Sequence, residues 1–306
     1  MRITIAGTRP QLLKAFAMGY PIVYTGQHWN ENMYTSHTEV CGIKCWVDLG
    51  AKTSDVRTLF RRIRDFLETQ PNIGQVIVPG DTNSALAAAM ATLAADRHLI
   101  HQEAGARSGQ TTVEEVNRIC IDRMASERWT VSKICGKNLE AEGLDYIYAG
   151  DPLLNMLEDN LEAMAQPTGV VKPFSLLTLH RAENVDEKQT LERLLTEVRL
   201  PAVWPVHPRV HKKISEGQFY APPEIQCIPP ANYLEMLWLL KHADHVYTDS
   251  GGVQREAMWL KKPLTVLRSA TEWLDTDEFK PWEEPCHYQN QHATESRQPN
   301  RARRSG

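Results

Sequence analysis

Short apolar runs alternate along the first half of the chain with segments in which apolar residues recur at helical spacing. This alternation is typical of parallel βαβ units, whose helices cover both faces of a sheet. The strands are predicted at 2–7, 22–25, 75–78, 99–103, 128–132 and 146–149, and the helices at 10–17, 54–69, 83–95, 113–125, 133–142 and 152–164.

A break at Pro167-Thr168-Gly169 separates this half from a second alternation of the same kind. The fold class is therefore α/β, with two Rossmann-like domains facing across a cleft, over residues 1–168 and 169–280. Residues 281–306 lose the pattern, are rich in Gln, Asn, His and Arg, and are expected to form a disordered tail. The second set of strands is predicted at 174–179, 202–206, 225–228, 244–248 and 263–267, and its helices at 187–198, 231–242 and 252–260.

Composition and charge limit the classes of partner and the cellular compartment that the sequence predicts. The net charge of -4 over 306 residues gives no basis for non-specific binding to nucleic acid or membranes. No apolar run approaches the roughly 18 residues that a membrane span needs. The chain begins with a predicted strand rather than a secretory signal, and its cysteines fall mostly in apparent core segments. We therefore expect a reduced cytoplasmic protein with buried thiols and no nucleic-acid or membrane partner, and we expect it to form a homodimer.

Polar residues follow the ends of several predicted strands in both halves. In an open α/β sheet, ligands bind beyond the carboxyl ends of the strands, so two facing domains would bring these groups to one cleft. The groups are Gly7 to Pro10, Gly80 to Asn83, Glu103 to Arg107, His180 to Asn184, and Asp249 to Glu256.

The last of these groups predicts an anion site. An apolar strand ends at Asp249, and Ser250 is placed to cap the helix that follows. Gly251 and Gly252 would let the backbone approach a ligand, and the free N–H groups of the helix start suit a phosphate or diphosphate. Glu256 lies about one turn into the helix, where it could accept both hydroxyls of a ribose. An ordinary strand–loop–helix corner explains the local pattern equally well.

Asp81, Glu103, Glu114 and Glu115 are the acid–base candidates. Carboxylates gathered in a closed cleft repel one another and lose hydration, which raises some of their pKa values and suits proton transfer at neutral pH. Glu114 and Glu115 have a structural alternative, because acids are favoured in the first turn of any helix.

Cations and histidines occupy the same strand ends, while metal and cofactor signatures are missing. Arg9 and Lys14 lie near the first crossover, where a solvated helix start is the alternative explanation, and His180 and His207 each follow a strand. The run from His101 to Glu103 matches half of a zinc-deaminase signature, but the PCxxC half is absent. No GxGxxG follows the first strand, and there is neither a P-loop nor a GxSxG elbow. We therefore expect neither a metal nor a cofactor.

Taken in order, these motifs resemble those of the non-hydrolysing UDP-N-acetylglucosamine 2-epimerases, and the resemblance covers residues 1–279. It implies a glycosyltransferase-B-like fold and reversible conversion of UDP-N-acetylglucosamine to UDP-N-acetylmannosamine, a precursor of bacterial surface polysaccharides. The family mechanism eliminates UDP to leave 2-acetamidoglucal, and then adds UDP back with carbon 2 inverted. The matching segments are Gly7 to Pro10 with Lys14, Thr25 to His28, Gly80 to Ser84, His101 to Arg107, Glu114 to Arg118, Leu179 to Asn184, Pro205 to Arg209, and Thr248 to Ala257.

The resemblance also assigns roles to individual residues. The first domain would carry the acid–base residues, and the second would bind UDP. The implied catalytic residues are Asp81, Glu103, Glu114 and His180; the substrate-binding residues are Arg9, Lys14, Arg118, Ser250, Gly251, Gly252 and Glu256; and a possible regulatory site comprises Gln27, His28 and His207.

The sequence departs from the family pattern at several points. Gln11 replaces an acid, Arg255 replaces the first acid of a Gln-Glu-Glu run, and a Thr-Glu-Arg-Pro-Glu motif becomes Thr271 to Asp275. The family's last segment, whose helix returns to the first domain, is missing or replaced by the tail. These departures bear on domain closure and regulation more than on the class of substrate.

Two other functions fit part of this pattern. A UDP-sugar glycosyltransferase would share the fold and the diphosphate site, but the carboxylates after Gly80 and Gln102 favour an epimerase. A nucleotide-sugar binding protein without turnover would fit the departures, but not the retained acids and His180. Proton NMR of the products formed from UDP-N-acetylglucosamine distinguishes the three.

Overall fold

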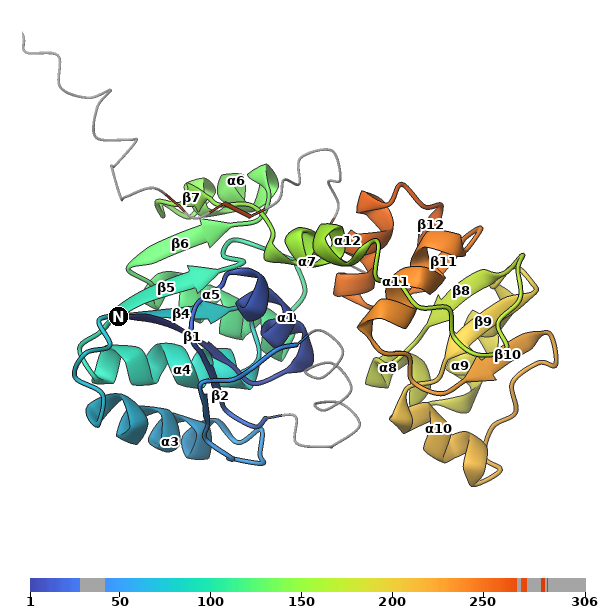
Figure 1. Cartoon of the computed structure of the whole chain (residues 1–306), viewed down its shortest axis with the longest axis horizontal. Coiled ribbons are helices and arrows are strands. Elements are labelled where there is room, and N and C mark those ends of the chain that lie inside the picture. The colour runs from blue at the N-terminus through green and yellow to red at the C-terminus, as the bar shows by residue number, and fades with distance from the viewer. Residues whose placement is uncertain (28–41, 269–270, 274–281, 284, 286–306) are drawn as a thin grey trace, which may run out of the picture.

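The computed structural model describes residues 1–27, 42–268, 271–273, 282–283 and 285. It contains two separate sheets in which every strand pair is parallel, which confirms the α/β class and the two Rossmann-like units (Figure 1). Within this part of the chain, no helix combines the length and apolarity required to cross a membrane.

The first domain has a seven-stranded sheet in the order β3-β2-β1-β4-β5-β6-β7. Ile3 and Ile5 pack against α3 and α4 on one face of this sheet, and Ala6 packs against α1 and α7 on the other. Because helices cover both faces of the sheet, consecutive residues of its strands are apolar in the sequence. The elements are β1 (Arg2–Ala6), α1 (Arg9–Ala17), β2 (Ile22–Tyr24), β3 (Val47–Asp48), α3 (Val56–Glu68), β4 (Gln75–Pro79), α4 (Asn83–Ala94), β5 (His98–Gln102), α5 (Val113–Met124), β6 (Glu127–Thr130), α6 (Lys133–Ala141), β7 (Ile147–Tyr148) and α7 (Pro152–Asn160).

The second domain has a five-stranded sheet in the order β10-β9-β8-β11-β12. Trp204 packs with α9 and α10 on one face, and Leu176 and Val246 pack with α11 and α12 on the other. The elements are β8 (Ser175–Thr178), α8 (Ala182–Val185), α9 (Lys188–Thr196), β9 (Ala202–Pro205), α10 (Pro208–Ser215), β10 (Ile225–Ile228), α11 (Tyr233–His242), β11 (Val246–Thr248), α12 (Gly251–Trp259) and β12 (Leu264–Val266).

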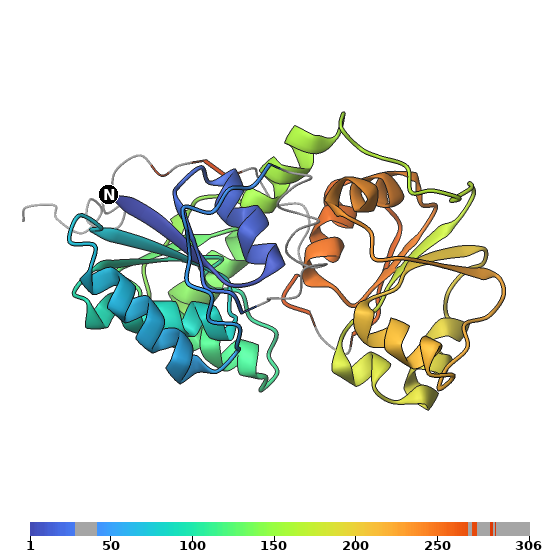
Figure 2. The ribbon, with the colours of Figure 1, turned by 60° about the horizontal axis from the view of Figure 1, so that its bottom comes forward.

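Helix α7 joins the two domains, and Figures 1 and 2 both show it between them. It contacts α1 of the first domain and α11 and α12 of the second. Leu153 and Met156 of α7 belong to one apolar cluster with Leu12 of α1 and Leu237 of α11. The domains therefore share a continuous core on this side, and the cavity described below lies between their sheets.

Gln11, one of the departures from the family pattern, has a clear structural role. Its Oε1 accepts hydrogen bonds from Gly7 N at 2.9 Å and Thr8 N at 3.1 Å, which closes the start of α1. Its Nε2 donates to Pro79 O at 2.6 Å and so ties α1 to the end of β4. A carboxylate could accept the first two bonds but has no hydrogen to donate to Pro79.

The structure corrects several details of the prediction. The short elements β3, α8 and α10 were not predicted, and α7 ends at Asn160 rather than at 164. Cys120 and Cys227 are exposed rather than buried, because one lies on the outer face of α5 and the other on the edge strand β10. Cys135 is buried as expected.

The domain limits at 168 and 280 remain predictions, and most of the expected tail lies outside the described residues. Trp282 and Glu283 are described, and both contact the first domain. The Trp282 amide donates to Asn155 Oδ1 at 2.6 Å, and its ring meets that of Tyr20 edge-on with centroids 6.3 Å apart. The Glu283 amide donates to Ala149 O at 2.9 Å. The chain thus returns to the first domain after β12.

Candidate functional site

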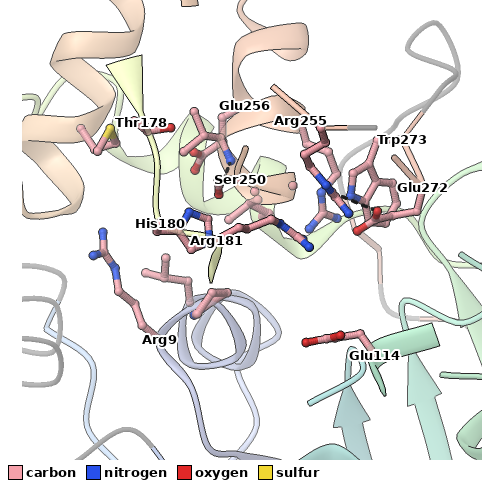
Figure 3. Close-up of a pocket in the computed structure, with 18 of the residues that line it drawn as sticks. Arg9, Glu114, Thr178, His180, Arg181, Ser250, Arg255, Glu256, Glu272 and Trp273 are labelled. Carbon is pink, nitrogen blue, oxygen red and sulfur yellow. Dashed lines mark hydrogen bonds and ion pairs between the residues drawn. The ribbon is translucent and has the colours of Figure 1, made fainter. Parts of the chain in front are cut away.

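A cavity of about 420 Å³ lies between the carboxyl ends of the two sheets. Its volume is within the range of roughly 300–1,000 Å³ that is usual for small-molecule sites. Figure 3 shows residues of both domains converging on it, with Arg9 and Glu114 on the first-domain side and Ser250, His180 and Glu256 on the other.

In each sheet, the order in which successive strands are added reverses next to this cavity. In the first sheet, β1 lies between β2 and β4, and in the second, β8 lies between β9 and β11. The loops that leave two such neighbouring strands separate and open a crevice, which is where open α/β sheets bind ligands. Both switch points supply residues to the cavity, Asp81 from the first and His180 and Ser250 from the second.

Asp81 is held at the cavity by Arg118. The two side chains form an ion pair, and Arg118 Nη1 also lies 2.6 Å from Glu115 Oε2. Asn117 fixes the loop by donating to Asp81 O at 2.9 Å. Burial raises the pKa of Asp81 and the nearby Glu103 adds to the effect, while Arg118 opposes it.

Glu103 has the most constrained position of the acids. Its backbone has φ +74°, a left-handed conformation that is costly for a residue with a Cβ and that recurs at functional sites. Its carboxylate forms an ion pair with Lys14, and its other oxygen lies 3.5 Å from Arg255 Nη2. Burial alone would raise its pKa, but Arg255 and Lys14 outweigh burial and lower the pKa to about 2. Glu103 is therefore ionised at neutral pH.

His101 does not face the cavity and supports the neighbouring loops instead. Its Nδ1 lies 2.6 Å from Asp122 Oδ1, and its Nε2 lies 3.0 Å from Gly80 O. Asp122 also accepts from Gly105 N at 3.2 Å. Both ring nitrogens are thus used to join the end of β4 to the loop after Glu103, and no group of three metal-ligating side chains occurs in the described part of the chain.

The second-domain wall is arranged around Asp249, which is fully buried. Its carboxylate accepts from the backbone N of His180 and of Arg181 and from Asn184 Nδ2, and it lies 2.7 Å from His180 Nδ1. Burial raises the pKa of Asp249, but the hydrogen bond and charge of His180 outweigh it, so the net shift is downward. Asp249 therefore fixes the ring of His180, whose side chain is 42% exposed at the cavity.

The start of α12 has the predicted serine cap and exposed glycine backbone. Gly251 is also required for a second reason, which is close packing against Trp273. Ser250 caps the helix, with its Oγ accepting from Val253 N at 3.4 Å. A Cβ on Gly251 would lie 2.8 Å from Trp273 Nε1, so this glycine allows the indole to pack closely. A Cβ on Gly252 would meet nothing nearer than 3.8 Å, which leaves its backbone accessible from the cavity.

Glu256 is almost fully buried behind these glycines, at 4% exposure. Burial raises its pKa from 4.5 to about 7, although a hydrogen bond with Tyr233 and the charges of Arg255 and Arg9 oppose the shift. An acid that titrates near neutrality in a cavity is a marker of a functional site.

The cavity is also lined by residues that were not among the predicted site residues. Arg268, Glu272 and Trp273 line it, with Arg268 Nη1 3.2 Å from Glu272 Oε2. They follow β12, so the strand-end rule could have found them as it found the others. Arg255, Glu272 and Trp273 had been noted only within departures from the family pattern. The guanidinium carbon of Arg255 lies 4.2 Å from the centroid of a Trp273 ring.

Most of the predicted site residues line this one cavity, and the possible regulatory residues are divided. His207 lines the cavity beside His180, with ring centroids 6.0 Å apart. Gln27 does not line it and instead accepts from Ser84 N at 2.9 Å and Ser84 Oγ at 2.6 Å. His28 lies outside the described residues. The predicted residues that line the cavity are Arg9, Lys14, Asp81, Glu103, Glu114, Arg118, His180, His207, Ser250, Gly251, Gly252 and Glu256.

Comparison with known proteins gives a consistent result. Residues 12–281 match the family described as UDP-N-acetylglucosamine 2-epimerase. The UDP-2,3-diacetamido-2,3-dideoxy-D-glucuronate 2-epimerase of Pseudomonas aeruginosa is 34% identical, over 89% of this chain and 84% of that protein. The UDP-N-acetylglucosamine 2-epimerase of Methanocaldococcus jannaschii is 32% identical, over 90% of this chain and 85% of that protein.

Solved structures give the same picture. The M. jannaschii UDP-N-acetylglucosamine 2-epimerase in complex with UDP-N-acetylglucosamine and UDP has a TM-score of 0.79 at 30% identity, covering 89% of this chain and 85% of that one. The Neisseria meningitidis enzyme bound to UDP-N-acetylglucosamine has a TM-score of 0.75 at 25% identity, covering 89% and 84%. The two-domain arrangement is therefore the glycosyltransferase-B-like fold that the sequence predicted.

Proposed function

This chain belongs to the UDP-N-acetylglucosamine 2-epimerase family, and we propose that it interconverts UDP-N-acetylglucosamine and UDP-N-acetylmannosamine by inverting carbon 2 of the sugar. The observation that carries the proposal is the cavity itself, where carboxylates of one domain face an anion-binding helix start of the other. The chain is accordingly an isomerase.

The reaction requires two proton-transfer steps. A carboxylate removes the carbon-2 proton while the bond from carbon 1 to the UDP oxygen breaks, which leaves a carbon 1–carbon 2 double bond and UDP. Addition of UDP to carbon 1, with a proton delivered to the opposite face of carbon 2, gives the epimer. The enzyme therefore needs one ionised and one protonated acid at the same time.

The first-domain acids suit these two tasks. Glu103 is ionised between Lys14 and Arg255, so it is in the protonation state that a base requires. Burial raises the pKa of Asp81 against the opposing charge of Arg118, so Asp81 takes up a proton more readily than an exposed aspartate would beside the same cation. Glu114 also lines the cavity and completes the acid–base set that we propose.

The second-domain residues suit binding of the departing UDP. The N–H groups at Gly251 and Gly252 and the positive end of the α12 dipole would hold the diphosphate. His180 is fixed by Asp249 in a position to stabilise the leaving phosphate, and Arg9 and Lys14 add positive charge from the facing domain. Glu256 would accept the ribose hydroxyls.

A related substrate is the second candidate. The P. aeruginosa relative is named for a UDP-2,3-diacetamido uronate, and it is as similar to this chain as the named UDP-N-acetylglucosamine epimerases are. Both sugars carry an acetamido group at carbon 2, so the same proton transfers would serve either. Comparing kcat/KM for the two nucleotide sugars identifies the natural substrate.

Incubation with UDP-N-acetylglucosamine, followed by proton NMR, tests the proposal. We expect an equilibrium mixture with UDP-N-acetylmannosamine, formed without added metal or nicotinamide. Transfer of the sugar to an acceptor would indicate a glycosyltransferase, and binding without product would indicate a nucleotide-sugar binding protein. Either outcome contradicts the epimerase.

We also propose that the protein acts in the cytoplasm as a homodimer, on a route to surface polysaccharide. The free thiols of Cys120, Cys135 and Cys227 support a reducing compartment. Light scattering of the purified protein tests the dimer. The regulatory role of Gln27, His28 and His207 is tested by substituting His207 and comparing the dependence of rate on substrate concentration.

A further inference from the structure

Arg255 connects the two domains inside the cavity. It extends from α12 of the second domain, and its side chain is only 3% exposed. Its Nη1 lies 2.6 Å from Asp151 Oδ2, and its Nη2 lies 3.5 Å from Glu103 Oε1. Both carboxylates belong to the part of the chain that precedes α7, and Figure 3 shows Arg255 beside Trp273 at this edge of the cavity.

Each of the two acids that contact Arg255 would lose a buried cationic partner without it. Asp151 has no exposed surface, and its other described partner is the Leu153 amide at the start of α7, 3.0 Å away. Removing the cation would leave Asp151 as an uncompensated buried charge, which costs far more than an exposed one. Glu103 would keep Lys14 but lose its contact with the second domain.

We propose that Arg255 is a positioning residue, which orients the Glu103 carboxylate when α12 of the second domain lies against the first. This inference rests on the proposed role of Glu103 as the base that acts on carbon 2. It also explains the departure at this position, since an acid in place of Arg255 would add a third carboxylate beside Asp151 and Glu103.

The effect of Arg255 on the pKa of Glu103 depends on the other charges around that carboxylate. Among the described residues, the groups that interact electrostatically with Glu103 include Lys14 from α1, Asp81 from the loop after β4, Arg118 from α5, Cys135 from α6, and Arg255 from α12. Within this set, Arg255 alone comes from the second domain. An adjacent opposite charge typically lowers a carboxyl pKa by about 1–3 units, so its removal should raise the pKa of Glu103 by a similar amount.

The test is the pH profile of kcat in the Arg255→Gln variant. We expect its acidic limb to move up by at least about one pH unit, because Glu103 then protonates more readily. Arg255→Lys keeps the charge but not the two-pronged contact, and it should bring the limb back towards the wild-type position. Arg268→Gln is the matched control, because it removes a cavity cation that pairs with Glu272 instead of Glu103.

A double variant, Arg255→Gln with Asp151→Asn, removes the orphaned charge together with its partner. It provides a folded protein for the same pH profile if the single variant is unstable. An unshifted limb in a folded Arg255 variant overturns the inference, as does an equal shift in Arg268→Gln. A wild-type protein that does not epimerise would instead overturn the proposed function, so the two failures are distinguishable.

Discussion

The two walls of the cavity are built in different ways. The first-domain wall consists of charged side chains that pair with one another, with Glu103 held by Lys14 and Asp81 held by Arg118. The second-domain wall consists mainly of a helix start, and its buried acid, Asp249, is used to fix backbone amides and His180. The first wall carries the acids, and the second presents amide groups to an anion and contributes one cation, Arg255, that contacts Glu103.

This difference suggests a division of labour. Paired carboxylates with opposite pKa shifts suit the proton transfers, because chemistry at carbon 2 needs both protonation states. A fixed helix start suits a group that is bound in every state of the reaction, as UDP would be. Substitutions of the first-wall acids should therefore change turnover, and substitutions around the start of α12 should change affinity. Arg255 is the exception, because it contacts Glu103 from the second wall.

The largest effect is expected in the first wall. Asp81→Asn, Glu103→Gln and Glu114→Gln should each lower kcat by at least about 10²-fold, the usual contribution of a general acid or base. The affinity for UDP, measured by calorimetry, should stay close to that of the wild type.

Glu115→Gln is the matched control for Glu114. Glu115 points at Arg118 and accepts from Ser108 N at 3.1 Å, so its role is to support the wall. A crippled Glu115→Gln beside a normal Glu114→Gln would place the third acid one residue later. UDP affinity that falls together with kcat in all three acid variants would break the division between the walls.

A smaller effect is expected in the second wall. Glu256→Ala should weaken UDP binding by about tenfold, or about 1.4 kcal/mol, because a ribose contact is present in ground and transition states alike. The turnover number should change little. Glu183→Ala, at an exposed position on α8, is the control for loss of a nearby charge. A normal KM with a collapsed kcat in Glu256→Ala would show that Glu256 takes part in the chemical step rather than in UDP binding.

The pH dependence of folding stability also differs between the walls, because the pKa values of Glu256 and Glu103 shift in opposite directions. Its folded pKa of about 7 lies above its ordinary value of 4.5, so the folded state favours the protonated form. The stability that Glu256 contributes is complete below its unfolded pKa and is lost as pH rises through the folded pKa. Glu103 shifts the other way, and its contribution is lost only as pH falls from 4.5 towards about 2.

Glu256→Gln cannot ionise, so it should stabilise the ligand-free protein by up to about 3 kcal/mol at pH 8 and by less than about 1 kcal/mol at pH 5. Thermal unfolding of both proteins at the two pH values measures this. The same difference in Tm at pH 5 and pH 8 would show that burial does not shift the titration of Glu256.

The sequence predicted the strand-end residues well because their positions follow from topology. Once the strands are placed, Asp81, Glu103, His180 and Ser250 must lie at the same edge of their sheets. The interactions across the cavity could not be predicted in this way. Arg255 lies one turn inside a helix, and its partners are contributed by distant segments whose approach depends on how the domains pack.

Other misses have equally local causes. Glu272 and Trp273 follow β12 in a loop with no helical or strand period. The strand-end rule therefore gives the edge of the sheet but not which side chains of the loop reach the cavity. The helix α10 carries Lys212 and Lys213 and buries Val210, a pattern too short and too charged to stand out. Cys120 was expected in the core, but a helix with one buried face exposes the residues opposite.

The central claim is that this cavity removes and returns the proton on carbon 2 of a UDP-linked 2-acetamido sugar. The most direct measurement is proton NMR of UDP-N-acetylglucosamine incubated with the enzyme in D₂O. The account predicts UDP-N-acetylmannosamine with deuterium at carbon 2, followed by deuterium at the same carbon of the remaining substrate. Product that keeps its original hydrogen at carbon 2 would contradict the account, because inversion would then have occurred without proton exchange at these acids.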